Sequence, residues 1–399
     1  EVERVAREAD ETQRMQVVRT TLEGKADSGL CDLFADLAIQ AADALSEEDG
    51  GGDLERLRVK RLQVRQGNVM DSSLVQGLML PKSRVDISTP ANSGGGVVAI
   101  VDGGLDHPKL EISAKIEVDS PGVMQGFHDR AIENLQRQVD HLASLGVDLL
   151  VVRDGIADEA VSLLAKAGIT AYRRFERTDL ELLSMMTGAK LSRDALHIDK
   201  GDVGDYAGRS EEAIADVKHT IIEGTCGGAM TLVVRGSSPA VREEAMRIFD
   251  DAIGVAHRLT SKPEILPGGG AIQIHLARHL RAFAPSQVGR EQLAIEAYAA
   301  ALEIVPRALA DNGGFDSVDV ILALSADQSE SGAWIGFDLG KGKNGDMSEA
   351  GILDPLFLVR HALSGATEAA ISVLRIDDVL WAKTEIGTPD WEEEEDSEG

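Results

Sequence analysis

The spacing of apolar residues changes character twice along this 399-residue chain. At both ends the apolar residues recur at helical spacing, as in Val5 to Leu45, whereas between about 97 and 234 short apolar runs alternate with helical segments. The runs 97–101 (VVAIV) and 149–152 (LLVV) suit buried strands and are too short for helices. A helical, then α/β, then helical order predicts a multidomain protein in which an α/β sandwich domain is inserted into a helical domain.

The same patterns predict the individual elements. Strands are predicted over 54–64, 97–101, 149–152, 169–172, 220–222 and 231–234. Helices are predicted over 126–145, 157–167, 179–186, 238–259, 270–284 and 290–311. A helix and a strand are expected within 72–80, and one long helix or two within 354–374.

The chain is strongly acidic. It has 40 Lys and Arg residues against 68 Asp and Glu, which gives a net charge of −28. Such a charge repels a phosphate backbone and an anionic lipid surface, so it excludes nucleic acid and membrane as partners held by general charge attraction. The acids are spread along the whole chain and aromatic residues make up only 4%. This composition favours a halophilic origin, with an ordinary acidic cytosolic protein as the alternative.

Two cysteines, Cys31 and Cys226, leave no disulfide framework and no cysteine metal knuckle. No apolar run approaches the roughly 20 residues that cross a bilayer, and the first residues carry no signal-peptide pattern. We therefore expect a cytoplasmic location. Cys226 lies in a glycine-rich segment typical of a turn, which argues against a catalytic nucleophile.

Two segments could carry chemistry. The glycine run in 267–271 (PGGGA) precedes an apolar helix, whose first N–H groups could contact a phosphate, although a flexible helix entry explains it equally and the Lys-Ser/Thr of a P-loop is absent. Asp250 and Asp251 could place a metal or polarise a water, although a solvated helix face is the simpler explanation. His275 and His279 stand at i and i+4 but lack a third ligand for zinc.

Longer stretches carry a family resemblance. They are 266–271 (LPGGGA), 289–316 (GREQLAIEAYAAALEIVPRALADNGGFD) and 364–378 (SGATEAAISVLRIDD). Together they resemble the C-terminal equatorial part of a group II chaperonin subunit, of the thermosome or TCP-1 type found in archaea. Three further segments follow one another in the order that the family shows, namely 20–25 (TTLEGK), 112–116 (ISAKI) and 231–236 (TLVVRG). The resemblance therefore covers nearly the whole chain.

The resemblance implies a division into domains. A largely helical equatorial ATPase domain would comprise 1–46 and 260–385, and a small α/β intermediate domain would comprise 47–80 and 230–259. An apical substrate-binding domain would comprise 81–229, with a helical protrusion at about 121–142 that serves as a lid. The acidic residues 386–399 would form a tail.

The resemblance also implies site residues and cofactors. Asp251 would orient and activate the water that attacks ATP. The implied nucleotide-binding residues are Gly24, Lys25, Gly269, Asp338 and Asp354. The implied cofactors are ATP and Mg²⁺, and the implied partners are unfolded polypeptides and identical or paralogous subunits in a double ring.

One departure from the family pattern affects the expected activity. The family's Asn-Asp-Gly turn and Gly-Asp-Gly-Thr-Thr loop, which bind phosphates and magnesium, do not occur in this sequence. We therefore expect the chain to be N-terminally incomplete, with the magnesium ligand in the missing segment. The leading hypothesis is an ATP-dependent molecular chaperone that encloses and folds polypeptides. The alternative is a passive polypeptide-binding or assembly subunit without ATP turnover.

Overall fold

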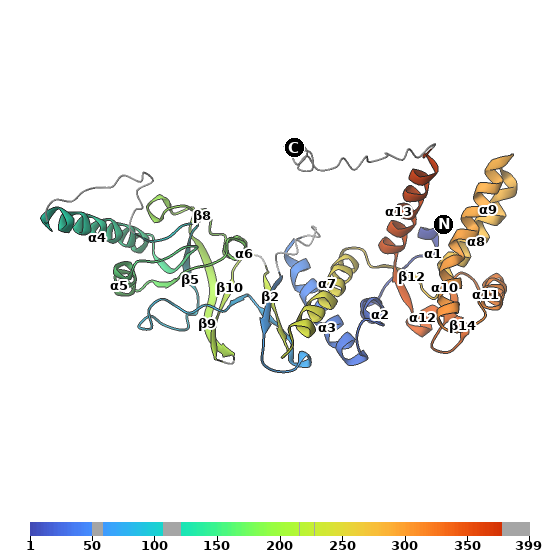
Figure 1. Cartoon of the computed structure of the whole chain (residues 1–399), viewed down its shortest axis with the longest axis horizontal. Coiled ribbons are helices and arrows are strands. Elements are labelled where there is room, and N and C mark those ends of the chain that lie inside the picture. Colours follow the sequence, from blue (N-terminus) through green and yellow to red (C-terminus); the bar gives the residue numbers. More distant parts are fainter. Residues whose placement is uncertain (50–58, 107–120, 215, 227, 377–399) are drawn as a thin grey trace, which may run out of the picture.

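The computed structural model of the protein describes residues 1–49, 59–106, 121–214, 216–226 and 228–376. These residues form an elongated molecule (Figure 1), with a body built on a large sheet at one end and a helical body at the other. The chain begins in the helical part, runs out to the sheet body and returns, which confirms the predicted α/β multidomain class. Within the described ranges, no helix has the length and apolarity needed to cross a membrane. The predicted acidic tail lies outside the described residues.

The elements have the following bounds. The helices are α1 Val2–Val5, α2 Glu11–Leu22, α3 Ser28–Asp49, α4 Pro121–Ser144, α5 Asp158–Lys166, α6 Arg177–Thr187, α7 Pro239–Ser261, α8 Ala271–Phe283, α9 Arg290–Leu302, α10 Ile304–Asn312, α11 Ser317–Ser331, α12 Met347–Ala350 and α13 Leu356–Leu374. The strands are β1 Arg7–Glu8, β2 Val59–Val64, β3 Ser73–Gln76, β4 Leu78–Leu80, β5 Gly96–Val101, β6 Val147–Val152, β7 Thr170–Tyr172, β8 Leu191–Ser192, β9 Gly204–Ile214, β10 Val217–Gly224, β11 Met230–Arg235, β12 Glu264–Pro267, β13 Ile335–Asp338, β14 Lys343–Asp346 and β15 Leu353–Pro355.

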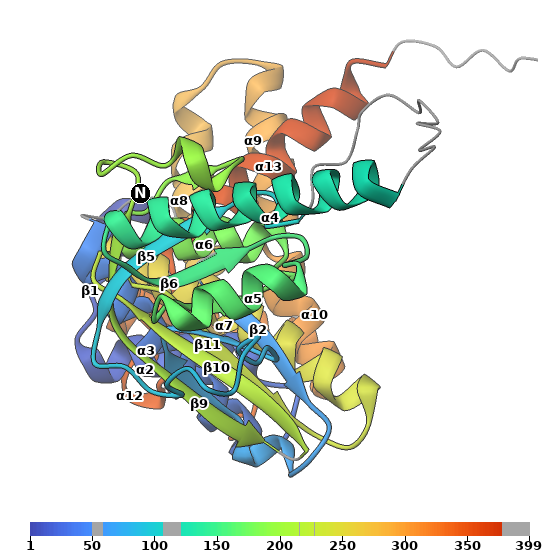
Figure 2. The ribbon, with the colours of Figure 1, turned by 90° about the vertical axis from the view of Figure 1, so that its left-hand side faces the viewer.

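The sheet body contains a mixed seven-stranded sheet in the order β4-β10-β9-β5-β6-β7, with β8 beside β5. Both faces of β5 are covered, which explains why its sequence is apolar without alternation. Val98 and Ile100 enter a core shared with α6, whereas Ala99 and Val101 enter a core shared with α4 and α5. Figure 2 views the molecule from this end, with α4 and α5 in front of the sheet. The strand β9 has no counterpart among the predictions, because charged residues interrupt its apolar pattern.

A three-stranded sheet stands between the two bodies, in the order β2-β11-β3. The strand β2 runs parallel to β11, with Val59 opposite Met230, and β3 runs antiparallel to it. The helices α3 and α7 pack on each other beside this sheet, and the rings of Phe34 and Phe249 meet edge to face at 6.5 Å between centroids. The predicted helix within 72–80 is wrong, because both apolar runs there pair as strands.

Two connections join this middle sheet, β2-β11-β3, to the sheet body. The outgoing connection is the single residue Gly77, between β3 and β4, and the returning connection lies between β10 and β11. The two are hydrogen-bonded to each other, since the Gly77 N–H donates to the Ala229 carbonyl oxygen at 2.8 Å. A Cβ on Gly77 would lie 2.5 Å from the Ile222 carbonyl oxygen, and its φ is +96°, so glycine is required there.

The helical body contains the small sheet β1-β12-β15, the hairpin β13-β14 and the helices α8 to α13. The single helix predicted over 290–311 is two helices that meet at Glu303. Pro306 has no N–H to donate to the turn before it, which explains the break. The helix predicted from residue 354 begins instead at Leu356, because Asp354 belongs to β15 and pairs with Leu266 of β12.

Candidate functional site

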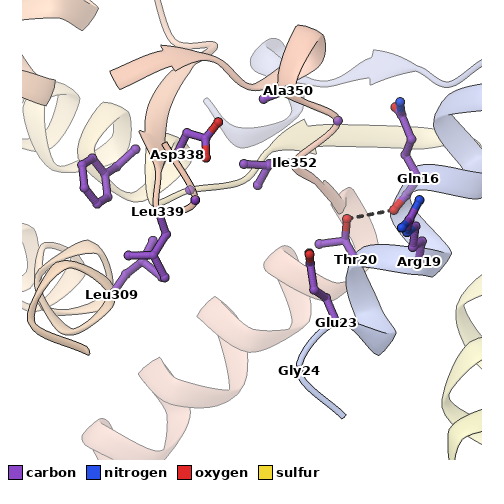
Figure 3. Close-up of a pocket in the computed structure, with 14 residues that line it drawn as sticks. Gln16, Arg19, Thr20, Glu23, Gly24, Leu309, Asp338, Leu339, Ala350 and Ile352 are labelled. Atoms are coloured by element: carbon purple, nitrogen blue, oxygen red, sulfur yellow. Dashed lines mark hydrogen bonds between the residues drawn. The ribbon is translucent and has the colours of Figure 1, made fainter. Parts of the chain in front are cut away.

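A cavity of about 910 Å³ lies where the end of α2 meets the β13-β14 hairpin and the segment that joins α12 to β15. Figure 3 shows Thr20 and Glu23 of α2 on one side, Asp338, Leu339 and Leu309 on the other, and Ile352 between them. The cavity is lined by Gln16, Arg19, Thr20, Glu23, Gly24, Gly269, Leu309, Phe337, Asp338, Leu339, Gly340, Ala350, Gly351 and Ile352. Its walls therefore combine carboxylates and glycine backbone with aliphatic side chains, a mixture that suits a ligand with both a charged and an apolar part.

The end of α2 forms one wall of this cavity. The helix starts firmly, because Asp10 and the side chain of Gln13 form a reciprocal capping box, and it ends at Leu22. Gly24 follows with φ at +83° and nothing within 4 Å of the place where a Cβ would be. The backbone conformation, and not crowding, therefore makes glycine favourable here, and the turn leaves this edge of the cavity open.

Lys25 connects this edge to α7. Its Nζ lies 2.6 Å from Oδ2 of Asp251, and both side chains are partly exposed. Lys25 directly follows Gly24, which lines the cavity, so the ion pair begins one residue beyond the lining, although neither Lys25 nor Asp251 belongs to it. The pair brings together two of the predicted site residues, which are far apart in the sequence.

Asp250 and Asp251 turn to different partners. Nε of Arg61, on β2, donates to Oδ1 of Asp250 at 2.9 Å, whereas Asp251 faces Lys25. The two neighbouring carboxylates therefore have separate partners, and a metal held between them stays a prediction. Within the described ranges no group of three or more His, Cys, Asp or Glu residues could hold a metal ion.

Gly269 also lines the cavity, but for a different reason than Gly24. A Cβ on Gly269 would lie 2.7 Å from both the Phe337 carbonyl oxygen and the Met347 sulfur, and its φ is +60°. The Phe337 N–H donates to the Gly269 carbonyl oxygen at 2.9 Å. Close packing of β13 on the turn thus requires glycine at this position, and the turn supports the cavity wall.

Asp338 ends β13 with its carboxylate largely covered. It accepts hydrogen bonds from Nζ of Lys341 at 2.8 Å and from the Lys341 N–H at 3.1 Å. These bonds hold the pKa of Asp338 below its ordinary value. The group is therefore a stable anion in the cavity wall at neutral pH.

Asp354, the last of the predicted residues, does not line this cavity. It lines a second cavity of about 460 Å³ between α9 and α13, where the other lining side chains are mostly apolar. No hydrogen bond or ion pair joins the side chain of Asp354 to another described residue, and burial raises the pKa of its carboxyl group. Ile352, two residues earlier, lines the first cavity, so one short segment separates the two.

Several cavity residues lie outside the set that the sequence predicted. The conspicuous ones are Gln16, Arg19, Thr20 and Glu23 on one face of α2, and Leu309, Leu339 and Ile352 on the opposite wall. The family-like string 20–25 contains Thr20 and Glu23, so it carried a signal for two of them. Apolar residues such as Leu309 carry none, because any buried helix face would show the same pattern.

Comparison with known proteins identifies the class. The family model of the TCP-1/cpn60 chaperonins matches residues 1–384, and the chain belongs to this family. The thermosome subunit beta of Archaeoglobus fulgidus is 35% identical over 370 residues, which are 92% of this chain and 68% of that protein. Thermosome subunit 1 of Haloferax volcanii is 35% identical over 376 residues, which are 94% and 67%.

A solved structure supports the same assignment. The open-state monomer of a group II chaperonin from Methanococcoides burtonii superposes with a TM-score of 0.71 at 25% identity, and the match covers 94% of this chain and 89% of that one. The chain is therefore a chaperonin subunit of the group II, thermosome type, as the resemblance predicted. The halophilic origin stays a prediction.

Proposed function

We propose that this chain is an ATP-dependent molecular chaperone subunit that encloses and folds unfolded polypeptides. It would act in a cytoplasmic double ring of identical or paralogous subunits. The observation that carries the proposal is the first cavity, because Gly24, Gly269 and Asp338 line it and the Lys25–Asp251 ion pair begins at the residue after Gly24. Residues 1–46 and 260–385 would form the ATPase domain around it.

The chemistry follows from the groups at this cavity. Transfer of a phosphoryl group to water requires a positioned water and stabilisation of charge on the phosphate oxygens. The Asp251 carboxylate would hold and polarise the attacking water, while the Lys25 ammonium, 2.6 Å away, would fix the direction in which that carboxylate points. The aliphatic wall of Leu309, Leu339 and Ile352 would contact the apolar faces of the nucleotide.

Magnesium fits this arrangement as a cofactor that arrives with the nucleotide. The ion usually keeps several waters and binds one or two carboxylates together with phosphate oxygens, so it needs no cluster of protein ligands. Asp251 is the carboxylate here that could take part. When bound, magnesium would neutralise charge on the phosphate oxygens. Asp354 remains a proposed contact to the ribose or base, from the far side of the segment that contains Ile352.

The helix that carries Asp251 can transmit the reaction. α7 begins directly after β11 of the middle sheet and ends just before β12, which leads into the Gly269 turn. A shift of Asp251 would therefore move α7 and, through β11, the connection to the sheet body. Residues 47–80 and 230–259 would act as the intermediate domain, and 81–229 would bind clients, with α4 as part of the lid.

The central test measures ATP hydrolysis by the purified chain and by Asp251→Asn. Loss of the water-positioning carboxylate should lower the rate by about 10²- to 10⁴-fold. Asp250→Asn is the matched control, because that neighbouring carboxylate pairs with Arg61 and should leave the rate within a few-fold. A chain that captures unfolded protein but hydrolyses no ATP, with or without the substitution, would support the passive alternative instead.

A further inference from the structure

A third cavity, of about 460 Å³, lies in the sheet body, far in the fold from the first. It forms where the segment after β4 crosses from β10 to β7. The Thr220 hydroxyl donates to the Lys82 carbonyl oxygen at 2.8 Å, and the Val85 N–H donates to the Ala171 carbonyl oxygen at 2.9 Å. The cavity is lined by Ser83, Arg84, Val85, Ile87, Arg173, Glu211 and Lys218.

Positive charge predominates in this lining, although the whole chain carries −28. Glu211 is the one acid among the lining residues, and it pairs with Arg84, whose Nη1 lies 3.0 Å from Oε2 of Glu211. Both of these side chains are nearly covered, with 12% and 8% exposed. Arg173 and Lys218 have no carboxylate within 4.0 Å among the described residues, and both are exposed.

A second arginine lies behind the cavity and draws on the same carboxylate. Arg209 is only 4% exposed, and its Nη1 donates to Oη of Tyr172 at 3.1 Å. Oη of Tyr172 donates in turn to Oε1 of Glu211 at 3.4 Å. The Glu211 carboxylate is thus paired directly with Arg84 and linked through Tyr172 to Arg209. With one carboxylate and two guanidinium groups, this network carries a net positive charge.

Two donors in this network have no acceptor. Nε of Arg84 and Nε of Arg209 are both buried and make no hydrogen bond to any described residue. A covered charge and a covered donor are each costly unless they are paired. Arg84 lines the cavity and is paired with Glu211, whereas the lining cations Arg173 and Lys218 have no carboxylate partner among the described residues, so an anion that entered would meet positive charge that is not compensated.

We propose that this cavity binds a carboxylate of an acidic polypeptide segment that carries aliphatic side chains, with Arg173 and Lys218 as the lining cations that have no carboxylate partner among the described residues. Arginine binds oxyanions through parallel N–H donors, and Arg84, Arg173 and Lys218 surround one space. The cavity is larger than one oxyanion, and Val85 and Ile87, the latter 79% exposed, offer apolar contact at its rim. The oxyanion site stands on these contacts alone, whereas the choice of a polypeptide rests on the proposed client-binding function.

The test is isothermal titration calorimetry of the full chain with three probes. They are the blocked peptide acetyl-LEEL-amide, its neutral counterpart acetyl-LQQL-amide, and inorganic phosphate. The acidic peptide should bind about 10-fold more tightly than the neutral one, the effect of one charge-assisted hydrogen bond. The double variant Arg173→Gln/Lys218→Gln should lose about 10- to 100-fold in affinity for it. Lys200→Gln, an exposed lysine elsewhere in the sheet body, should bind like the unaltered chain.

Other results would overturn the proposal. Equal binding of the two peptides would make the cavity an apolar contact only, and binding of phosphate without the acidic peptide would make it a free-phosphate site. Unchanged affinity in the double variant, with its circular dichroism intact, would move the site elsewhere. Capture of an unfolded protein, measured on the same preparations, reports on the proposed function separately, so a failure of one is distinguishable from a failure of the other.

Discussion

The two cavities of the helical body lie on either side of the same short segment, yet they treat a carboxylate in opposite ways. Asp338, in the wall of the larger cavity, accepts two hydrogen bonds from Lys341, and the pKa of Asp338 is lowered. Asp354, in the smaller cavity between α9 and α13, has no partner among the described residues, and burial raises the pKa of Asp354.

The contrast distinguishes two ways in which a cavity can be built. The larger cavity lies between helix α2 and several turns, and the carboxylate of Asp338 in its wall is paired with Lys341. The smaller one is formed by helix faces, with an isolated carboxyl group among apolar side chains and with Oε1 of Gln273, another lining residue, buried without a donor. Stability measurements should therefore respond with opposite signs when the two carboxyl groups are neutralised.

The largest effect should come from the turn that supports the larger cavity. Gly269→Ala should lower the free energy of unfolding by about 3 kcal/mol, from the left-handed backbone and from overlap of the new Cβ with Phe337. Gly24→Ala is the matched control, since it shares the left-handed backbone without the overlap, and should cost about 1 kcal/mol. Denaturant midpoints of both variants test this. Equal losses of stability in the two variants would mean that β13 moves away from the new Cβ at no cost in free energy.

The second effect, from the replacement of Asp354, should raise the free energy of unfolding. Because the pKa of Asp354 is raised in the folded chain, ionisation at rising pH favours the unfolded chain until the folded pKa is passed. Asp354→Asn cannot ionise, so it should stabilise the fold at neutral pH by about 1 kcal/mol. The gain should shrink as the pH falls towards the ordinary value of about 4. Denaturant melts from pH 5 to 8 measure it, and a loss of stability at pH 8 would show that Asp354 has a donor partner.

The smallest effect concerns Asp338. Its lowered pKa means that its contribution is present above the ordinary value and is lost as the pH falls through the folded pKa. Asp338→Asn should therefore destabilise the fold at neutral pH by about 0.5 kcal/mol, and the difference should vanish in acid. Glu330→Gln, an exposed carboxylate on α11 without a hydrogen bond to another described residue, is the control. An Asp338→Asn variant indistinguishable from that control would weaken the contrast.

The sequence predicts the fold well where one pattern dominates. The runs 97–101 and 149–152 could be recognised as strands because both faces of these strands are buried. The strand β9 could not, because four charged residues interrupt its apolar pattern and one of them, Arg209, is buried. The break between α9 and α10 at Glu303 could not be predicted either, because the helical spacing of apolar residues continues across it.

The candidate site was predictable in part, and for different reasons at different residues. Lys25 could be proposed only from the family resemblance, whereas Asp251 was already a candidate as one of two neighbouring carboxylates. Nothing in the spacing of a helix and a distant turn says that the two residues meet. The environment of Asp354 could not be predicted at all. Whether a carboxyl group in a strand faces a polar or an apolar cavity depends on how α13, which follows directly, packs against α9, which is distant in sequence.

The hydrogen bond between Gly77 and Ala229 ties the outgoing and returning connections into one ribbon. Apolar side chains also cross this joint, because Met79 of β4 shares a buried core with Leu62 and Val233 of the sheet β2-β11-β3. A tilt of the sheet body about the two connections would therefore open this core and should be resisted. A steady pull on the two ends would load both connections together instead of unravelling one before the other.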